Sequence, residues 1–246
     1  PQVSTGAVEF RHVSFGYSPE HQLMHDVNIT VKSGQKVAIV GPTGAGKTTL
    51  INLLMRFYDV DGGSILVDGV DTKEMTRHEL RDRFGMVLQD AWLFEGSIRD
   101  NIAYAQDNLP EEKIIAAARS ASVDSFIKTL PGGYDFELST GAENISQGQR
   151  QLLTIARAMA SDPEIMILDE ATSNVDTHTE QLIQKALAKL MHGRTSFVIA
   201  HQLSTIRDAD MILYMEHGDI LEHGSHEELM AQHGKYEALY MSQFAQ

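Results

Sequence analysis

The chain has no cysteine among its 246 residues, so it has neither disulfide bonds nor thiolate metal sites. This absence agrees with a cytosolic location. Long hydrophobic runs are also missing, and a run such as Ile165–Leu168 is far shorter than the ~20 apolar residues of a membrane-spanning helix. Pro1–Ala7 lacks the charged start and apolar centre of a signal peptide, so we expect no secretory leader.

Positive charge is scarce, because 20 Lys and Arg stand against 34 Asp and Glu, giving a formal net charge of −14. A general affinity for nucleic acid needs clustered basic residues that displace counterions, so we expect no nucleic-acid partner. Recognition of phosphate must then be local. The 11 histidines are scattered and show no H-E-x-x-H spacing, which gives no sign of a histidine metal site.

The most informative stretch is a glycine-rich loop that fits the pattern G-x-x-x-x-G-K-[ST]. It follows the apolar run Val37–Val40 and precedes a helical pattern, which is the context that the motif requires and that a chance glycine-rich turn would lack. The loop residues that we expect to bind a nucleoside triphosphate are Gly41, Pro42, Thr43, Gly44, Ala45, Gly46, Lys47, Thr48 and Thr49. Glycines let backbone N–H groups turn toward phosphate oxygens, Lys47 adds positive charge, and Thr48 offers a hydroxyl to Mg²⁺.

Two kinds of strand pattern flank this loop. Val8–Val13 and Val27–Val31 alternate apolar and polar residues, which predicts half-buried antiparallel strands, with Phe15-Gly16-Tyr17 between them. Uniformly apolar runs, typical of buried parallel strands, occur at Lys36–Val40, Ile165–Leu168 and Thr195–Ala200. Further strands are predicted at Ser64–Val67, Gly85–Leu88, Met211–Glu216 and Asp219–Glu222, and further helices at Arg77–Asp82, Thr177–Leu190 and after the capping box at Ser225.

The middle of the chain, from about residue 90 to 160, shows helical rather than strand patterns. Pro110 opens an Ala- and Ile-rich helix, and Gln149–Ala160 is a second strong helical pattern. We therefore predict a single α/β domain with a P-loop core, a mostly parallel sheet, an N-terminal antiparallel β subdomain and an all-helical insert. The core would comprise residues 1–88 and 161–246, and the α-helical subdomain residues 89–160.

Polar residues follow the buried strands at the ends where ligands bind in open parallel sheets. Asp169 would hold Mg²⁺, and Glu170 would orient and deprotonate the attacking water. The alternative is that both acids are helix N-caps. His201 is placed to donate to the γ-phosphate, although a lone histidine is commonly structural. Gln89 also ends a strand and is placed to reach metal or water at the same edge.

Tyr17 is a candidate for stacking on an adenine ring, and a half-buried core aromatic is the alternative.

Together these residues closely resemble one family: the nucleotide-binding domain of ATP-binding-cassette transporters. The resemblance covers essentially the whole chain and rests on seven segments in the family's order. They are Tyr17, Gly41–Thr48, Gln89, Ile145-Ser146-Gln147-Gly148-Gln149, Ile165–Glu170, Ser173-Asn174-Val175-Asp176 and His201.

The resemblance implies an ATPase with Mg²⁺ as cofactor that works as a pair of domains closing around two nucleotides. The signature residues Ser146, Gln147, Gly148 and Gln149 would contact the nucleotide of the partner domain, and Ser173 and Asp176 would form the loop after the base. Helices of a transmembrane partner would dock near Gln89–Phe94, on the cytoplasmic side of the plasma (inner) membrane. This segment and Ser97–Ile102 resemble the exporter type, and the chain's start just before the first strand suggests a domain of a longer protein. Packing within the helical insert is the alternative role for Trp92 and Phe94.

The signature departs from the family's Leu-Ser-Gly-Gly-Gln, because Gln147 replaces the first glycine and Ile145 the leucine. A side chain at Gln147 is expected to restrict the backbone and crowd the phosphate. With Glu170 intact, the pattern resembles the catalytically competent half of a heterodimeric multidrug exporter, whose partner lacks the catalytic glutamate. The alternative to the heterodimer is a homodimer. The alternative to an exporter is a non-transport relative acting on DNA or ribosomes. An unrelated GTPase is disfavoured because the sequence lacks N-K-x-D.

Overall fold

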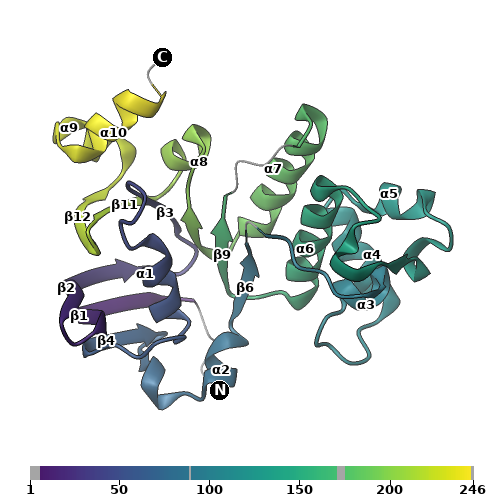
Figure 1. Cartoon of the computed structure of the whole chain (residues 1–246), viewed down its shortest axis with the longest axis horizontal. Coiled ribbons are helices and arrows are strands. Elements are labelled where there is room, and N and C mark those ends of the chain that lie inside the picture. The colour runs from purple at the N-terminus through teal and green to yellow at the C-terminus, as the bar shows by residue number, and fades with distance from the viewer. Residues whose placement is uncertain (1–5, 89, 171–174, 245–246) are drawn as a thin grey trace. The chain divides into compact units, whose positions relative to one another are not determined.

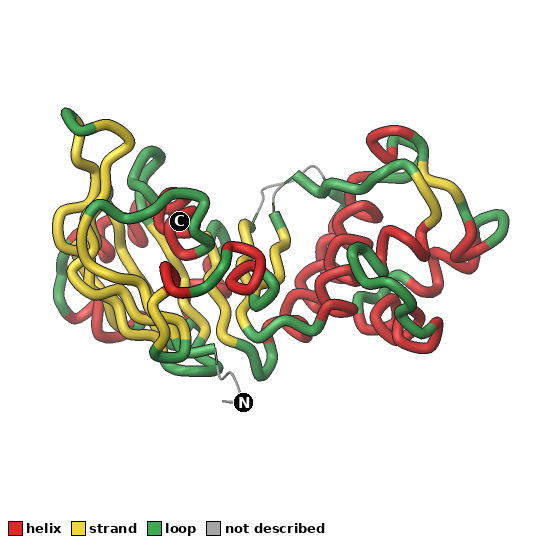
Figure 2. The backbone as a smooth tube through the Cα atoms, turned by 90° about the horizontal axis from the view of Figure 1, so that it is seen from below, coloured by secondary structure: helices red, strands yellow, loops and turns green. Residues whose placement is uncertain are grey.

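The computed structural model describes residues 6–88, 90–170 and 175–244, and the chain divides into two compact units (Figure 1). Unit 1 comprises Pro1–Phe84, Glu164–Glu170 and Gly193–Gln246, and unit 2 comprises Gly85–Pro163 and Ala171–His192. Strands predominate in unit 1 and helices in unit 2 (Figure 2). Within the described ranges, every helix is too short or too polar to traverse a lipid bilayer.

Unit 1 contains an antiparallel sheet with the strand order β2-β1-β4-β5. Its strands are β1 (Val8–Ser18), β2 (His21–Val31), β4 (Gly62–Val67) and β5 (Val70–Asp71). The alternation that predicted β1 is interrupted at Arg11 and His12, which are both exposed, and His12 takes a positive φ of 49°. This bulge restores the burial of Val13 and Phe15, so β1 continues past the predicted end and includes Tyr17.

The second sheet of unit 1 is mostly parallel and carries the phosphate loop. Its strands in unit 1 are β3 (Lys36–Val40), β9 (Ile165–Asp169), β10 (Thr195–Ile199), β11 (Met211–Glu216) and β12 (Asp219–Gly224), in the order β12-β11-β3-β10-β9. Strand β10 runs parallel to both β3 and β9, and β11 runs parallel to β3. The carboxyl ends of β3, β10 and β9 therefore lie at one edge. The predicted α/β fold class is confirmed.

Short helices complete unit 1, and the chain passes into unit 2 within β6 (Phe84–Val87). The helices are α1 (Lys47–Leu54), α2 (Arg77–Arg81), α8 (Leu203–Arg207), α9 (His226–Ala231) and α10 (Lys235–Phe244), with a 3₁₀ turn at Thr72–Glu74. Helix α1 follows β3 directly through the loop at residues 41–46, as predicted. The capping boxes at Thr76 and Ser225 fix the starts of α2 and α9.

Unit 2 is built around α6 and α7. Its helices are α3 (Ile98–Ile102), α4 (Glu111–Ser120), α5 (Asp124–Thr129), α6 (Gln147–Ser161) and α7 (Thr177–Met191), with 3₁₀ turns at Gly133–Asp135 and Thr140–Ala142. The expectation of an all-helical insert is wrong in one detail: β7 (Gly96–Ser97) pairs with β8 (Glu137–Leu138). Two-residue strands leave no alternation to detect. Helix α7 packs on α6, so unit 2 extends beyond the expected residues 89–160.

Candidate nucleotide site

The phosphate loop adopts a backbone that only glycine accommodates at two of its positions. Gly41 has φ +154°, and a Cβ atom there would lie 2.2 Å from the Met215 carbonyl oxygen. Gly46 has φ +95°, and a Cβ atom there would lie 2.9 Å from the Gly218 Cα. The spacing of these glycines is therefore dictated by the close approach of the β11–β12 hairpin as well as by loop curvature.

Helix α1 begins at Lys47 with Gly46 as its N-cap, and glycine provides no side chain to cap the first-turn N–H groups. Such a helix start is suited to an anion. The Lys47 ammonium folds back over the loop and donates to the Gly41 carbonyl oxygen at 2.8 Å. Burial lowers the pKa of Lys47, and the negative charge of Asp169 opposes that shift. Thr48, beside Lys47, is exposed.

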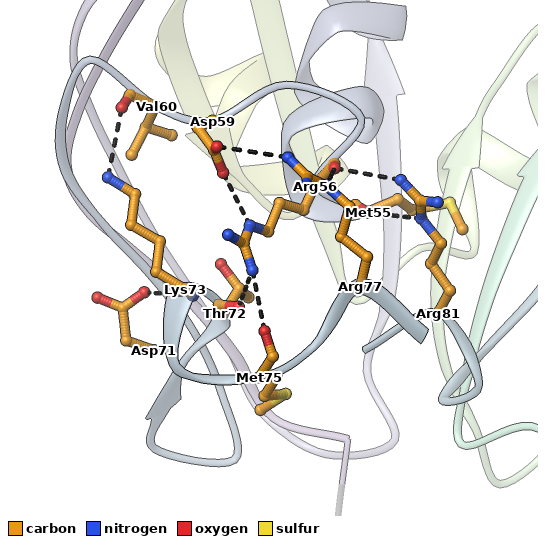
Figure 3. A network of polar contacts seen from close by, with 10 residues as sticks. All are labelled: Met55, Arg56, Asp59, Val60, Asp71, Thr72, Lys73, Met75, Arg77 and Arg81. Atoms are coloured by element: carbon orange, nitrogen blue, oxygen red, sulfur yellow. Dashed lines mark hydrogen bonds and ion pairs between the residues drawn. The ribbon is translucent and has the colours of Figure 1, made fainter. Parts of the chain in front are cut away.

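The other end of α1 is anchored by an arginine network that the sequence reading missed (Figure 3). Arg56, just beyond the helix, has φ 57° and donates to the carbonyl oxygens of Thr72 at 3.2 Å and Met75 at 2.9 Å. Arg81 donates to the carbonyl oxygens of Met55 at 3.3 Å and Arg56 at 3.2 Å. Cationic donors thus satisfy carbonyl groups at the negative end of the helix dipole and fix the helix that presents Lys47.

Asp169 and His201 lie together at the carboxyl edge of the parallel sheet. Asp169 is the last residue of β9 and is in register with Ile199 of β10, and His201 follows that strand. The His201 Nε2 atom lies 3.8 Å from an Asp169 carboxylate oxygen, and both side chains are partly exposed. With Lys47, this edge gathers a cation, a carboxylate and an imidazole from three segments distant in sequence.

Glu170 takes a different direction from Asp169, and its residue is only 6% exposed. One carboxylate oxygen accepts from the backbone N–H groups of His201 at 2.9 Å and Gln202 at 3.0 Å. The other oxygen accepts from the Thr205 hydroxyl. Glu170 therefore binds the segment that leads into α8, but it is not the N-cap of that helix, which is Gln202. Thr205 was missed, since nothing in its local sequence indicates this partner.

Tyr17 is exposed at 56%, rather than half-buried in a core. Its hydroxyl shares a hydrogen bond of 2.7 Å with the Thr49 hydroxyl on α1. Edge-on ring contacts with Phe15 and Tyr58, at centroid distances of 5.0 and 5.1 Å, hold the ring. The open ring is thereby tied to the phosphate-loop helix, in a geometry that leaves a face available for stacking.

The signature segment forms the start of α6 in unit 2. Ser146 and Gln149 make a capping box: the Gln149 N–H donates to the Ser146 hydroxyl at 3.2 Å, and the Ser146 N–H donates to the Gln149 side chain at 2.9 Å. Gln147 is the first helical residue and is exposed. Its φ is not positive, so the backbone conformation at Gln147 does not require glycine, and the expected crowding of a phosphate by its side chain stays a prediction.

Close packing requires glycine at position 148, which the sequence did not reveal. A Cβ atom there would lie 2.4 Å from Thr179 Cγ2 and 3.1 Å from Val175 Cγ1, so α6 approaches α7 too closely for a side chain. Asp176 is the N-cap of α7, and it accepts from the Thr179 N–H at 2.9 Å. The predicted Gln89 and Ser173 lie outside the described residues.

Three aromatic rings gather in unit 2 around one arginine. Trp92 is 60% exposed, and its ring contacts those of Phe94 and Tyr104 at centroid distances of 6.2 and 6.0 Å. The Arg157 guanidinium lies 4.9 Å from the Tyr104 ring centroid and donates to the Trp92 carbonyl oxygen at 2.9 Å. These rings line a hollow of about 410 Å³, open to solvent. Trp92 and Phe94 thus pack on Tyr104 while leaving an apolar surface exposed.

A family model described as "ABC transporter" matches residues 24–173. The Bacillus subtilis protein YfiC, named an uncharacterized ABC transporter ATP-binding protein, is 53% identical over 98% of this chain and 40% of its own length. A fatty acid ABC transporter ATP-binding/permease protein of Mycobacterium bovis is 55% identical over 94% of this chain and 37% of its own length.

A solved structure, of a bacterial Atm1-family ABC exporter with ATP bound, matches with a TM-score of 0.90 and 41% sequence identity. The match covers 100% of this chain and 43% of that chain. The chain thus spans about two fifths of the length of these relatives. Because the family model matches more than half of the chain and the fold agrees throughout, the chain belongs to the ABC transporter family and is an ATP-binding domain of the kind that hydrolyses ATP.

Proposed function

We propose that the chain is the motor domain of an exporter, in which MgATP binds at the phosphate loop and its hydrolysis drives transport. The observation that carries this proposal is the convergence of Lys47, Asp169 and His201 at the carboxyl edge of β3, β9 and β10. A cradle of N–H groups and one cation would bind the triphosphate, and a carboxylate beside it can serve a metal. Tyr17 would stack on the adenine.

The side chains beside the loop fit Mg²⁺. The described residues contain no group of three or more His, Asp or Glu that would hold a metal by themselves. Mg²⁺ is commonly bound through one or two protein oxygens together with substrate phosphates, which matches the Thr48 hydroxyl, the Asp169 carboxylate and, as proposed, the Gln89 amide. Bound there, the ion would neutralise charge on the phosphates. His201 would donate to the γ-phosphate, and Glu170 would take a proton from the attacking water.

The Glu170→Gln variant tests the hydrolysis step. We expect it to retain ATP binding and to lose turnover by about 10²- to 10⁴-fold, because the amide cannot accept the proton. ATPase rate and nucleotide affinity would be measured together. Glu112→Gln, which changes an exposed acid on α4, is the control for the loss of one negative charge. Unchanged turnover in Glu170→Gln would remove Glu170 as the base.

The exporter part of the proposal rests on the relatives and on the aromatic hollow. The relatives include an ATP-binding/permease protein and an exporter, and this chain matches only part of each. We infer that transmembrane domains supply the rest, and that their coupling helices dock near Gln89–Phe94 on the cytoplasmic side of the inner membrane. The exposed Trp92 lines a hollow of about 410 Å³, and this apolar surface is suited to the docking of such a helix.

We further propose a partner domain that closes over the bound ATP with its own signature segment. Ser146, Gln147 and Gly148 at the start of α6 would in turn contact the partner's nucleotide, and Asp176 at the start of α7 would act with Ser173 as the loop after the base. Because Gln147 places an exposed side chain where a phosphate would approach, we propose that this second site is the weaker one. The assembly would then be a heterodimer whose partner has lost its catalytic glutamate, and a homodimer is the alternative.

A further inference from the structure

The Glu170 carboxylate lies away from water, although a general base must reach the water that it deprotonates. Its residue is 6% exposed, while the neighbouring Asp169 side chain is 25% exposed. Glutamate is rarely buried to this extent unless partners satisfy its charge. The backbone gives Glu170 little freedom to move, because its N–H donates to the Ile199 carbonyl oxygen at 3.1 Å. A change in its direction must therefore come from the side chain.

Three donors account for the buried direction of this side chain. Two are the backbone N–H groups of His201 and Gln202, which no substitution of a side chain removes. The third is the Thr205 hydroxyl, from a residue that is itself only 6% exposed. An ionised carboxylate only accepts hydrogen bonds, so Thr205 is the donor in this pair. Among the residues that the structure describes, Thr205 is thus the side chain that holds the second oxygen of Glu170.

We propose that Thr205 is a positioning residue that holds Glu170 in the buried direction and thereby restrains hydrolysis. The inference rests on the proposed role of Glu170 as the base. Without the Thr205 hydroxyl, this oxygen of a buried carboxylate would lose the donor that the described part of the chain provides, which favours the rotamers in which the oxygen meets water. The two remaining donors belong to His201 and the residue after it. A shift of His201 toward a phosphate would therefore also withdraw N–H groups from Glu170.

Thr205→Val tests the inference, because valine keeps the shape of threonine and removes its hydroxyl. We expect kcat for ATP hydrolysis to rise by about threefold to tenfold, while KM for ATP changes by less than about twofold, because the loop and Tyr17 are untouched. Thr205→Ser retains a hydroxyl and should return kcat to the wild-type value. Ser204→Ala, which removes an exposed hydroxyl from the same helix, is the matched control. Thr205→Ala provides a second variant without the hydroxyl, and thermal unfolding shows that each variant is folded.

A lower kcat in both Thr205→Val and Thr205→Ala, or equal rates for Thr205→Val and Thr205→Ser, would overturn the inference. The same assays in a Glu170→Gln background separate it from the proposed function. If Glu170→Gln alone abolishes turnover and Thr205→Val brings no gain in the wild type, only the role of Thr205 fails. If Glu170→Gln retains turnover, the assignment of the base fails instead. If both hold, the double variant should be as slow as Glu170→Gln.

Discussion

At the scale of single residues, Gly148 shows that a signature glycine can be required by packing. The site for its missing Cβ lies 2.4 Å from Thr179 Cγ2, across the α6–α7 contact. Gly148→Ala should therefore push the two helix starts apart and lower the free energy of unfolding by about 1–3 kcal/mol, as overpacking does in other close contacts. Urea denaturation of the purified chain measures this change.

The companion substitution for Gly148→Ala is Thr179→Ser, which removes the obstructing methyl and keeps the hydroxyl that donates to Asp176 at 2.7 Å. The double variant should recover most of the lost stability, since the two residues are in contact and their effects should not add. Equal stability of the single and double variants would mean that the α6–α7 contact is not what excludes a side chain at Gly148.

Single residues also show which features could be predicted from the sequence and which could not. The position of the loop glycines and Lys47 between β3 and α1, and of Asp169 at the end of β9, could be predicted because a short motif and a strand end are local signals. The Arg56 network and the Thr205 contact could not, since both join segments that only the folded chain brings together. The physical cause is the same in each case: a buried carbonyl or carboxylate accepts whichever donor the fold places within reach.

At the scale of elements, regular hydrophobic patterns predicted the main strands of the two sheets. The end of one strand and two very short strands were not predicted, because the pattern is irregular or too short there. Strand β1 was predicted only over Val8–Val13, but a bulge at the exposed pair Arg11 and His12 absorbs an extra residue and the strand runs on to Ser18. Strands β7 and β8 were missed because two residues carry no period. Long helices such as α7, with a capping aspartate at Asp176, were predicted nearly to the residue.

The segment from Phe94 to Ser97, which leads into α3, is held by the side chain of Asn101, which is fully buried. Its amide accepts from the Phe94 N–H and donates to the carbonyl oxygens of Phe94 and Ser97, each at 3.0 Å. Asn101→Leu would fill the same space and remove these three hydrogen bonds from the backbone of Phe94 and Ser97. We expect the free energy of unfolding to fall by about 3 kcal/mol. Denaturant unfolding followed by the fluorescence of Trp92 measures the loss.

The control for Asn101→Leu is Asp100→Asn, a polar substitution on the exposed side of the same helix. It should leave stability within about 0.5 kcal/mol of the wild type. If Asn101→Leu were as stable as this control, the turn that presents Trp92 and Phe94 would be held by the Arg157 contacts alone, which also reach the Asn101 carbonyl oxygen at 2.9 Å.

At the scale of the whole molecule, charge bears on the choice of partner. Two copies of this chain would each carry a formal net charge of −14, so long-range repulsion would oppose their association at low ionic strength. A less acidic homologous domain would meet less repulsion. The net charge and the side chain at Gln147 therefore both support the proposed heterodimer over the homodimer. Local contacts around the bound nucleotide would nevertheless contribute more than net charge to the final affinity.

Nucleotide trapping in the full-length transporter decides between the two assemblies. Vanadate added during turnover traps ADP where hydrolysis has occurred, so the proposed heterodimer should retain one ADP per pair of domains. Hydrolysis would be confined to the site formed by Lys47, Asp169 and Glu170 of this chain and the signature of its partner.

Glu170→Gln in this chain alone should abolish trapping altogether, because in the proposed heterodimer the partner supplies no second base. The matched variant, a substitution of Gln147 to glycine, should leave that single competent site trapping one ADP. Two trapped nucleotides per pair, or a purified transporter that contains only copies of this chain, would instead establish the symmetric homodimer.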